Sequence, residues 1–580
     1  MTEAPPENLP AIVAFCLVTA ALLAVAMSMS ILWLYRRAVL RHMRAASESV
    51  SVDDTEAAAY APAFPPPSAA RTWPLEVVME DAAEPIAAGE RDAQLLRAAL
   101  AGPWRNGIVY GLGGLAFAVV MTGAVLLADP GGPPAYTRIA ARLWTYLWPV
   151  VITLLLTAAC SRAQRAWIVA GYLAVFAVIG TLAMGRNSPV SPPDLLLSWA
   201  LEGVIPALLA LAFLVRPVRS VGTLVATLML TGAFGAQVLV SWTGASVGPM
   251  RDAASPGGVL GIAGHGAFLG LTVAGFLLAA IAGWWLARWL WRRYERKQVG
   301  EQALVVDSTW LLFAIAHGVD LAAYGAGWPV VALLAFAAYK LVAHAGFTLL
   351  SAVAMPVLPR HLLLLRVSGL GTGSESFFDD FRTLWQHVGS VFMVAGPDHF
   401  TRMIEPRELL EFVAGRLSRR FIASRADLEE QLQRLDYRQD PDGRYRFNEL
   451  FCHDSTWLAT VRRLAMMSDA VLMDLRGFEA RKLGCTFEIG ALVGSVNLSK
   501  VVFLTDASTD HALLENVLQE QWSKRSARGP LVPVESAARI VCMSTGTVGS
   551  MRHLLGRLLP ERAPREDRCA RGDRSTGIAA

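Results

Sequence analysis

Long apolar stretches dominate the first 355 residues, and they constrain the fold more than any other feature of the chain. A helix needs about 20 mostly apolar residues to cross the hydrocarbon core of a bilayer. Nine stretches reach this length: 10–34, 107–128, 141–160, 166–185, 195–215, 220–242, 259–288, 303–325 and 328–354. Only 17% of the 580 residues are charged, whereas soluble proteins have about 25%. We therefore predict an all-α polytopic membrane domain with about nine transmembrane helices.

The placement of arginine predicts the orientation of these helices, because cytoplasmic loops of membrane proteins are enriched in Lys and Arg. Basic residues follow the first, third, fifth and seventh stretches: Arg36, Arg37, Arg41, Arg44, Arg162, Arg165, Arg216, Arg219 and the segment RWLWRRYERK. The opposite loops contain only Arg138, Arg186 and Arg251. This alternation predicts a multi-pass protein of the inner or plasma membrane, with the N-terminus outside and the C-terminal region in the cytoplasm. The lipid bilayer is the first predicted partner, and a net charge of +4 is too small to indicate a nucleic-acid partner.

Composition divides the chain into five segments. They are a first transmembrane anchor (1–35), a cytoplasmic linker rich in Ala and Pro with a short helix (36–105), an eight-helix transmembrane domain (106–355), a cytoplasmic α/β domain (356–545) and a terminal helix with a disordered tail (546–580). The amino end MTEAPPENLP has no basic residue, so we interpret the first stretch as a retained anchor rather than a signal peptide.

Several ionisable residues fall inside the predicted spans, where their cost invites a functional interpretation. They are His265, Asp307, His317, Asp320, Lys340 and His344. We expect Asp320 and Lys340 to pair, and Asp307 to reach the membrane interface. Three interpretations stay open: a structural contact that fixes helix packing, a pathway for protons or ions, and a ligand-sensing site.

The region after residue 356 alternates short apolar strands with amphipathic helices. The predicted strands are 362–367, 390–395, 470–475, 500–505 and 538–543. Near-continuous apolar strands are typical of a parallel sheet that is covered on both faces, and the alternation predicts a doubly wound, flavodoxin-like α/β fold with five strands. An insertion at about 400–455 separates the second and third strands. It contains a predicted hairpin with Asp440-Pro441-Asp442-Gly443 as the turn.

A ligand site is expected where the strand order of such a sheet reverses, between the loops after the first and third strands. The first loop carries Gly369, Gly371, Gly373 and Ser374 and leads into a helix predicted to begin at residue 375. Glycine lets backbone N–H groups approach a phosphate, and a helix N-terminus favours an anion. The spacing matches neither a dinucleotide fingerprint nor a P-loop, so a plain turn and a ligand loop both stay open.

The second loop contains Arg476 and Phe478, and Glu488 follows in the next predicted helix. Glu488 begins an otherwise apolar run. A carboxylate there must pair with a base or face the crevice, and Arg476 is a candidate positive partner. The six cysteines form no CxxC pair, so we predict no metal site.

The stretch SDAVLMDLRGFEARKLGCTFEIGALV (468–493) resembles the third strand and following helix of Toll/interleukin-1 receptor (TIR) domains. Cys485 and Glu488 fit the family's cysteine and glutamate, and Ser374-Glu375 with Phe378 is similar to the family's opening. The resemblance implies a TIR-like sheet, NAD or a related nucleotide as a substrate rather than a tightly bound cofactor, and Glu488 as the catalytic residue. It also implies homo-oligomers formed through this domain. The glycine-rich first loop and the insertion depart from the family pattern.

Three classes of function are therefore compatible with the sequence. The first is a membrane-anchored signalling or defence effector of bacteria whose TIR-like domain binds or hydrolyses a nucleotide. The second is a non-enzymatic signalling scaffold, and the third is a transporter with a cytoplasmic regulatory domain. Whether the domain is an enzyme stays open at this point.

Overall fold

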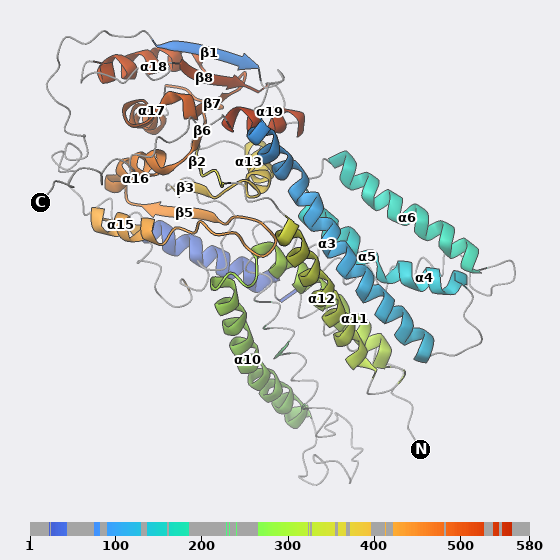
Figure 1. Ribbon diagram of the computed structural model, residues 1–580. Coiled ribbons are helices and arrows are strands. Elements are labelled where there is room, and N and C mark those ends of the chain that lie inside the picture. The colour runs from blue at the N-terminus through green and yellow to red at the C-terminus, as the bar shows by residue number, and fades with distance from the viewer. Residues whose placement is uncertain are drawn as a thin grey trace, which may run out of the picture.

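The helical part contains several helices that are long and apolar enough to cross a membrane (Figure 1). The computed structural model describes residues 25–42, 75–81, 90–128, 136–158, 162–184, 265–322, 328–353, 358–366, 372–395, 421–480, 483–526, 537–543 and 548–559, with a few single residues besides. The helices of this part are α3 (Glu90–Ala128), α4 (Tyr136–Tyr146), α5 (Trp148–Thr157), α6 (Arg162–Met184), α10 (His265–Glu295), α11 (Glu301–Ala322) and α12 (Pro329–Val353).

Five candidate spans occur among these described residues, so nine are not confirmed. They are Ala93–Ala128, Ile139–Thr157, Ala163–Leu182, Leu269–Glu295 and Val330–Ser351. α11 forms a helix where the eighth span was predicted. The predicted spans 195–215 and 220–242 lie almost entirely outside the described residues. The first predicted span is described only in part, as a helix over 25–42.

Aromatic side chains packed against glycines hold α3, α11 and α12 together. Trp310 of α11 stacks on Tyr339 of α12 with ring centroids 5.1 Å apart. A Cβ on Gly114 of α3 would lie 2.4 Å from the Trp310 ring, and one on Gly113 would lie 2.8 Å from Tyr339. Glycine therefore lets α3 approach both helices closely, as small residues do in membrane bundles.

Lys340 of α12 forms an ion pair inside this bundle, with a different partner from the one expected. Its Nζ lies 2.6 Å from Oδ2 of Asp307, and the Tyr339 hydroxyl donates to Oδ1 at 3.0 Å. The packing of α11 on α12 places Asp307 opposite Lys340. The Asp320 side chain lies outside the described residues, so the expected pairing of Lys340 with Asp320 stays a prediction. The pair joins α11 to α12, which favours the structural interpretation of these two residues.

The α/β domain is built on a sheet of eight strands, not five, and every strand pairing is parallel. The strands are β1 (Glu76–Asp81), β2 (Leu362–Arg366), β3 (Val391–Ala395), β4 (Phe421–Ile422), β5 (Phe447–Cys452), β6 (Ala470–Asp474), β7 (Val501–Thr505) and β8 (Ala537–Cys542). Their order is β1-β8-β7-β6-β2-β3-β5-β4. The five predicted strands are β2, β3, β6, β7 and β8.

Three strands come from segments that were predicted to be linker or insertion. β1 lies within the predicted linker 36–105 and pairs with β8 along its whole length, from Glu76 opposite Ala537 to Asp81 opposite Cys542. β4 and β5 come from the insertion and extend the opposite edge. Residues 90–105 of the supposed linker belong to α3, which runs without a break from Glu90 into the apolar bundle. The described residues 75–81 and 90–105 are therefore part of the fold.

Helices cover both faces of the sheet, as the apolar strands predict. One face packs against α15 (Arg425–Gln433), α16 (Asp454–Met467), α17 (Leu483–Ser495) and α18 (His511–Ser526). The other packs against α13 (Thr372–Trp385), α19 (Val548–Leu558) and the first turns of α3. Along β2, Leu363 and Leu365 enter the first core, whereas Leu362 and Leu364 enter the second. Alternate side chains of a strand point to opposite faces, so all four leucines are buried.

Candidate functional site

The carboxyl ends of β2 and β6 meet at the point where the strand order reverses. From β2 the chain proceeds to β3 on one side, whereas β6 lies on the other side of β2. The two strands pair in register up to Arg366 opposite Asp474. This is the edge at which open α/β sheets bind ligands, and the structure brings it together as the sequence predicts.

Two arginines and two phenyl rings gather at this edge. Arg476 forms a bidentate ion pair with the fully buried Asp474, with Nε–Oδ1 at 2.8 Å and Nη2–Oδ2 at 3.1 Å. Its guanidinium carbon also lies 4.9 Å from the ring centre of Phe377. Arg366 lies over Phe378 at 5.0 Å. Arg476 is thus paired with Asp474, and both guanidinium groups lie against phenyl rings of the same two residues.

The N-terminal turn of α13 is adjacent to this cluster, since Phe377 and Phe378 belong to α13. The helix begins at Thr372, earlier than predicted, so Gly373 and Ser374 lie in its first turn. Gly369 and Gly371 lie outside the described residues. The positive end of a helix next to two arginines favours an anion such as phosphate.

Glu488 lies in α17, the helix that follows β6. Cys485, Ile489 and Leu492 share its helix face and are buried in the core beneath α17. Glu488 is only 7% exposed, and its Oε2 has no hydrogen-bond partner within the described part of the chain. Burial without a compensating charge raises the pKa of this carboxyl to about 8. Perturbed carboxyls of this kind are typical of acid–base catalysts.

The remaining predicted site residue, Phe478, is a core residue. It is 1% exposed and belongs to the same hydrophobic cluster as Cys485 and Ile489. Its backbone N–H donates to Leu475 and its carbonyl accepts from Asp510. The ring therefore supports the turn after β6 from below and is not available for stacking on a ligand in this conformation.

The sequence did not single out Arg366 and Asp474 as site residues. Each is the next-to-last residue of a predicted apolar strand and the last residue of the strand in the structure, and that position was the available indication. Strand ends at a reversal of strand order converge in space. A charged residue at the end of an apolar strand therefore indicates a candidate site residue even where no motif is present.

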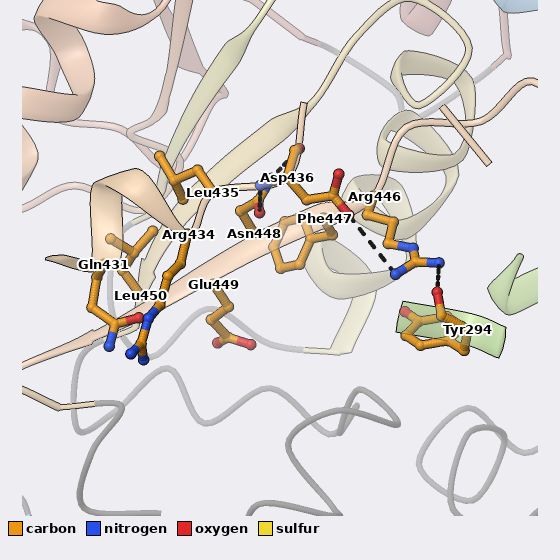
Figure 2. A pocket seen from close by; sticks show the side chains of 10 residues that line it. All are labelled: Tyr294, Gln431, Arg434, Leu435, Asp436, Arg446, Phe447, Asn448, Glu449 and Leu450. Atoms are coloured by element: carbon orange, nitrogen blue, oxygen red, sulfur yellow. Dashed lines mark hydrogen bonds and ion pairs between the residues drawn. The ribbon is translucent and has the colours of Figure 1, made fainter. Parts of the chain in front are cut away.

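A small pocket lies elsewhere, between α10 and the segment from α15 to β5 (Figure 2). Tyr294 of α10 forms one wall, and Arg446, Asn448 and Glu449 lie opposite or beside it. Its cavity volume is about 50 Å³, whereas sites for small organic ligands usually measure about 300–1,000 Å³. The pocket is therefore too small for a nucleotide.

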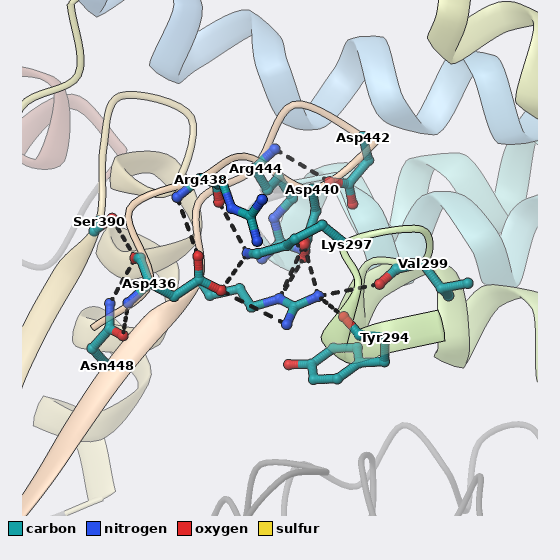
Figure 3. A network of polar contacts seen from close by, with 11 residues as sticks. Tyr294, Lys297, Val299, Ser390, Asp436, Arg438, Asp440, Asp442, Arg444 and Asn448 are labelled. Atoms are coloured by element: carbon teal, nitrogen blue, oxygen red, sulfur yellow. Dashed lines mark hydrogen bonds and ion pairs between the residues drawn. The ribbon is translucent and has the colours of Figure 1, made fainter. Parts of the chain in front are cut away.

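A charged hairpin next to this pocket joins the α/β domain to α10 and to the turn that follows it (Figure 3). We call residues 436–446 the docking hairpin. Its turn has the predicted form, because Gly443 donates to the Asp440 carbonyl at 2.9 Å and has a positive φ of 78°. Arg446 forms a bidentate ion pair with Asp440 and donates to the Tyr294 carbonyl at 2.6 Å.

Lys297, in the turn between α10 and α11, completes this ion-pair network. Its Nζ lies 2.6 Å from Asp436 and 3.2 Å from Asp440, and it donates to the Arg438 carbonyl at 2.9 Å. On α3, the Asn106 side chain donates to the Asp442 carbonyl at 3.0 Å. The docking hairpin is thus held by residues of α3, of α10 and of the α10–α11 turn.

The C-terminal end of α13 lies at the same junction. Arg382 is 3.9 Å from Glu301 of α11, and Gln386 accepts a hydrogen bond from Arg444 of the docking hairpin. The next residue, His387, packs so closely on α3 that a Cβ on Gly102 would lie 2.4 Å from its ring. Burial and the nearby arginines hold the pKa of His387 well below its usual range. α13 and the two residues after it therefore contact α3 and α11 at one end, and α13 contacts the arginine cluster at the other.

Comparison with known proteins adds nothing to this geometry. No family model, no curated protein and no solved structure matches the chain.

Proposed function

We propose that this protein is a membrane-anchored signalling protein whose α/β domain binds and hydrolyses NAD or a related nucleotide. The supporting observation is the cluster at the carboxyl ends of β2 and β6. Arg366 and Arg476 carry positive charge at the reversal of strand order, and the N-terminus of α13 adds a partial positive charge. A diphosphate at this edge would meet both arginines and the backbone N–H groups around Gly373.

The chemistry follows from the resemblance to TIR domains and from the burial of Glu488. Hydrolysis breaks the bond between the nicotinamide nitrogen and ribose C1′. Water supplies the hydroxyl that ends on C1′, and a proton is released. Positive charge develops on the ribose in the transition state, and a nearby carboxylate stabilises it. Burial keeps Glu488 mostly protonated at neutral pH, so in this role it must first release its proton to solvent, and the resulting carboxylate then stabilises the charge on the ribose.

The membrane part would regulate this site through α13. Its C-terminal end contacts α3, α11 and the docking hairpin, and its first turn lies beside the arginine cluster. A shift of the bundle helices would therefore be transmitted to the nucleotide site by a single helix. We further propose the nine-span topology, with the N-terminus outside the inner or plasma membrane and the α/β domain in the cytoplasm, and homo-oligomers formed through that domain.

The test is NAD loss catalysed by the purified full-length protein, with wild type compared against E488Q and R476Q. We expect wild type to release nicotinamide, E488Q to bind NAD without cleaving it, and R476Q to bind it more weakly. Equal rates for wild type and E488Q would remove Glu488 from the catalytic role. A folded wild-type protein that neither binds nor cleaves nucleotides would favour the scaffold interpretation instead.

A further inference from the structure

The last three turns of α10 present two faces of opposite character. One face points at the α/β domain, where the nearly buried Tyr294 ring lies 3.6 Å under the Arg446 guanidinium carbon. At 100° per residue, Trp285, Arg288, Trp289, Arg292 and Arg296 all fall on the other face. All five are exposed. The face turned away from the domain therefore combines indole rings with guanidinium groups, and we call it the Trp/Arg face.

The length of α10 places this face at the headgroup level of a membrane. The helix has 31 residues, which corresponds to about 46 Å at 1.5 Å per residue, whereas the hydrocarbon core is about 30 Å thick. Its first five turns expose aliphatic side chains such as Leu269, Leu277 and Ile281. The tryptophans begin where these end, as interfacial aromatic residues do.

Among the described residues, the arginines of this segment have no acidic partners, in contrast to the cations of the adjacent junction. Within the described part of the chain, no carboxylate pairs with Arg288, Arg292, Arg293 or Arg296. Arg293 instead lies 4.6 Å over the Trp289 ring and donates to Gln298 at 3.1 Å. The segment 285–296 contains four arginines and a single glutamate, the exposed Glu295. Lys297 and Arg446, in contrast, are both neutralised by Asp436 and Asp440.

We infer that the Trp/Arg face of α10 is a binding surface for anionic phospholipid, in the leaflet on the side of the α/β domain. Exposed guanidinium groups without acidic partners match a phosphodiester headgroup in charge and hydrogen-bond geometry. The indole rings cover the glycerol and upper acyl region of the same lipid. The inference is independent of what the nucleotide site does.

The test titrates full-length protein in neutral detergent with dioctanoyl-phosphatidylglycerol, dioctanoyl-phosphatidylcholine and glycerol 3-phosphate, and follows binding by thermophoresis. Each arginine near an anionic surface contributes about fivefold, equivalent to about 1 kcal/mol. We expect phosphatidylglycerol to bind at least about tenfold more tightly than phosphatidylcholine, and R288Q/R292Q/R296Q to lose this preference. The preference should also shrink as NaCl rises from about 0.05 to about 0.5 M.

The matched control removes three exposed arginines elsewhere, as R97Q/R434Q/R552Q, and should retain the preference. R288K/R292K/R296K keeps the charge and should retain most of the preference for phosphatidylglycerol. This variant serves as the test if the glutamine variant does not fold. Equal affinity of wild type for the two lipids, or an undiminished preference in a folded glutamine variant, would overturn the inference. Glycerol 3-phosphate binding as tightly as phosphatidylglycerol would exclude the lipid as the occupant.

Discussion

Replacing Asp440 by Asn should destabilise the α/β domain at its junction with α10 and the α10–α11 turn. The Asp440 carboxylate accepts from Arg446 Nε at 3.0 and 3.1 Å and lies 2.9 Å from its Nη2. It also lies 3.2 Å from Lys297 Nζ. The Asp440 side chain is 4% exposed and the Arg446 side chain 11%. D440N therefore leaves two buried cations to share Asp436.

Breaking a buried ion pair from one side costs about 3–5 kcal/mol. We expect the lower end, about 3 kcal/mol, because Asp436 stays in place. For a domain of about 150–250 residues, each kcal/mol lowers the melting temperature by about 2–4 °C, so the drop should be about 6–12 °C. Reaction of the buried Cys452 and Cys485 thiols with a fluorogenic reagent reports unfolding of the domain.

Two further variants make this measurement decisive. The double variant D440N/R446Q should lose little more than D440N alone, because both changes remove the same contact. R434Q removes an exposed pair with Glu430 at 2.5 Å, and such pairs contribute about 1 kcal/mol or less. A shift of less than about 2 °C in D440N, or strictly additive effects of D440N and R446Q, would refute the reasoning.

Three other predictions test single positions. Burial raises the pKa of Asp442 to about 6, above its unfolded value of about 4. The contribution of Asp442 to stability should therefore be present below pH 4 and lost as pH rises through 6. In melting curves recorded from pH 4 to 7.5, D442N should abolish this pH dependence. G102A should destabilise the junction by about 1–3 kcal/mol, because its Cβ would lie 2.4 Å from the His387 ring, whereas G123A, with open space around it, should leave the melting temperature unchanged or raised. E488Q should raise the melting temperature at pH 7 and abolish NAD cleavage. The stability should rise because the variant removes a buried carboxyl whose pKa lies near 8. A less stable E488Q would mean that the carboxylate has a partner on which folding depends.

The sequence predicted the parts of the fold that rest on local apolar patterns. β2, β3, β6, β7 and β8 are short and nearly continuous in apolar residues, and the predicted helices after the first and third strands form as α13 and α17. β1 was missed because EVVMED is a short, half-polar segment in an Ala/Pro-rich region, and only its pairing with β8, far along the chain, makes it a strand. β4 has two residues, too few for any pattern.

The same distinction separates what was predicted of the site from what was not. Arg476 and the first turn of α13 were found because strand ends and helix starts are visible in the sequence. The pairing of Lys340 with Asp307 depends on how α11 and α12 align, which periodicity alone does not determine. The docking hairpin was predicted as a hairpin, but its contact with Asn106 joins residues 336 positions apart. Such contacts depend on tertiary packing and leave no local pattern.

The most direct test of the proposed nucleotide site is hydrogen exchange of the full-length E488Q protein with and without NAD, since this variant should bind without cleaving. We expect slower exchange in peptides that cover 366–378 and 474–478, the two segments that form the carboxyl edge between β2 and β6. Unchanged exchange at saturating NAD, or protection confined to the docking hairpin, would contradict this expectation.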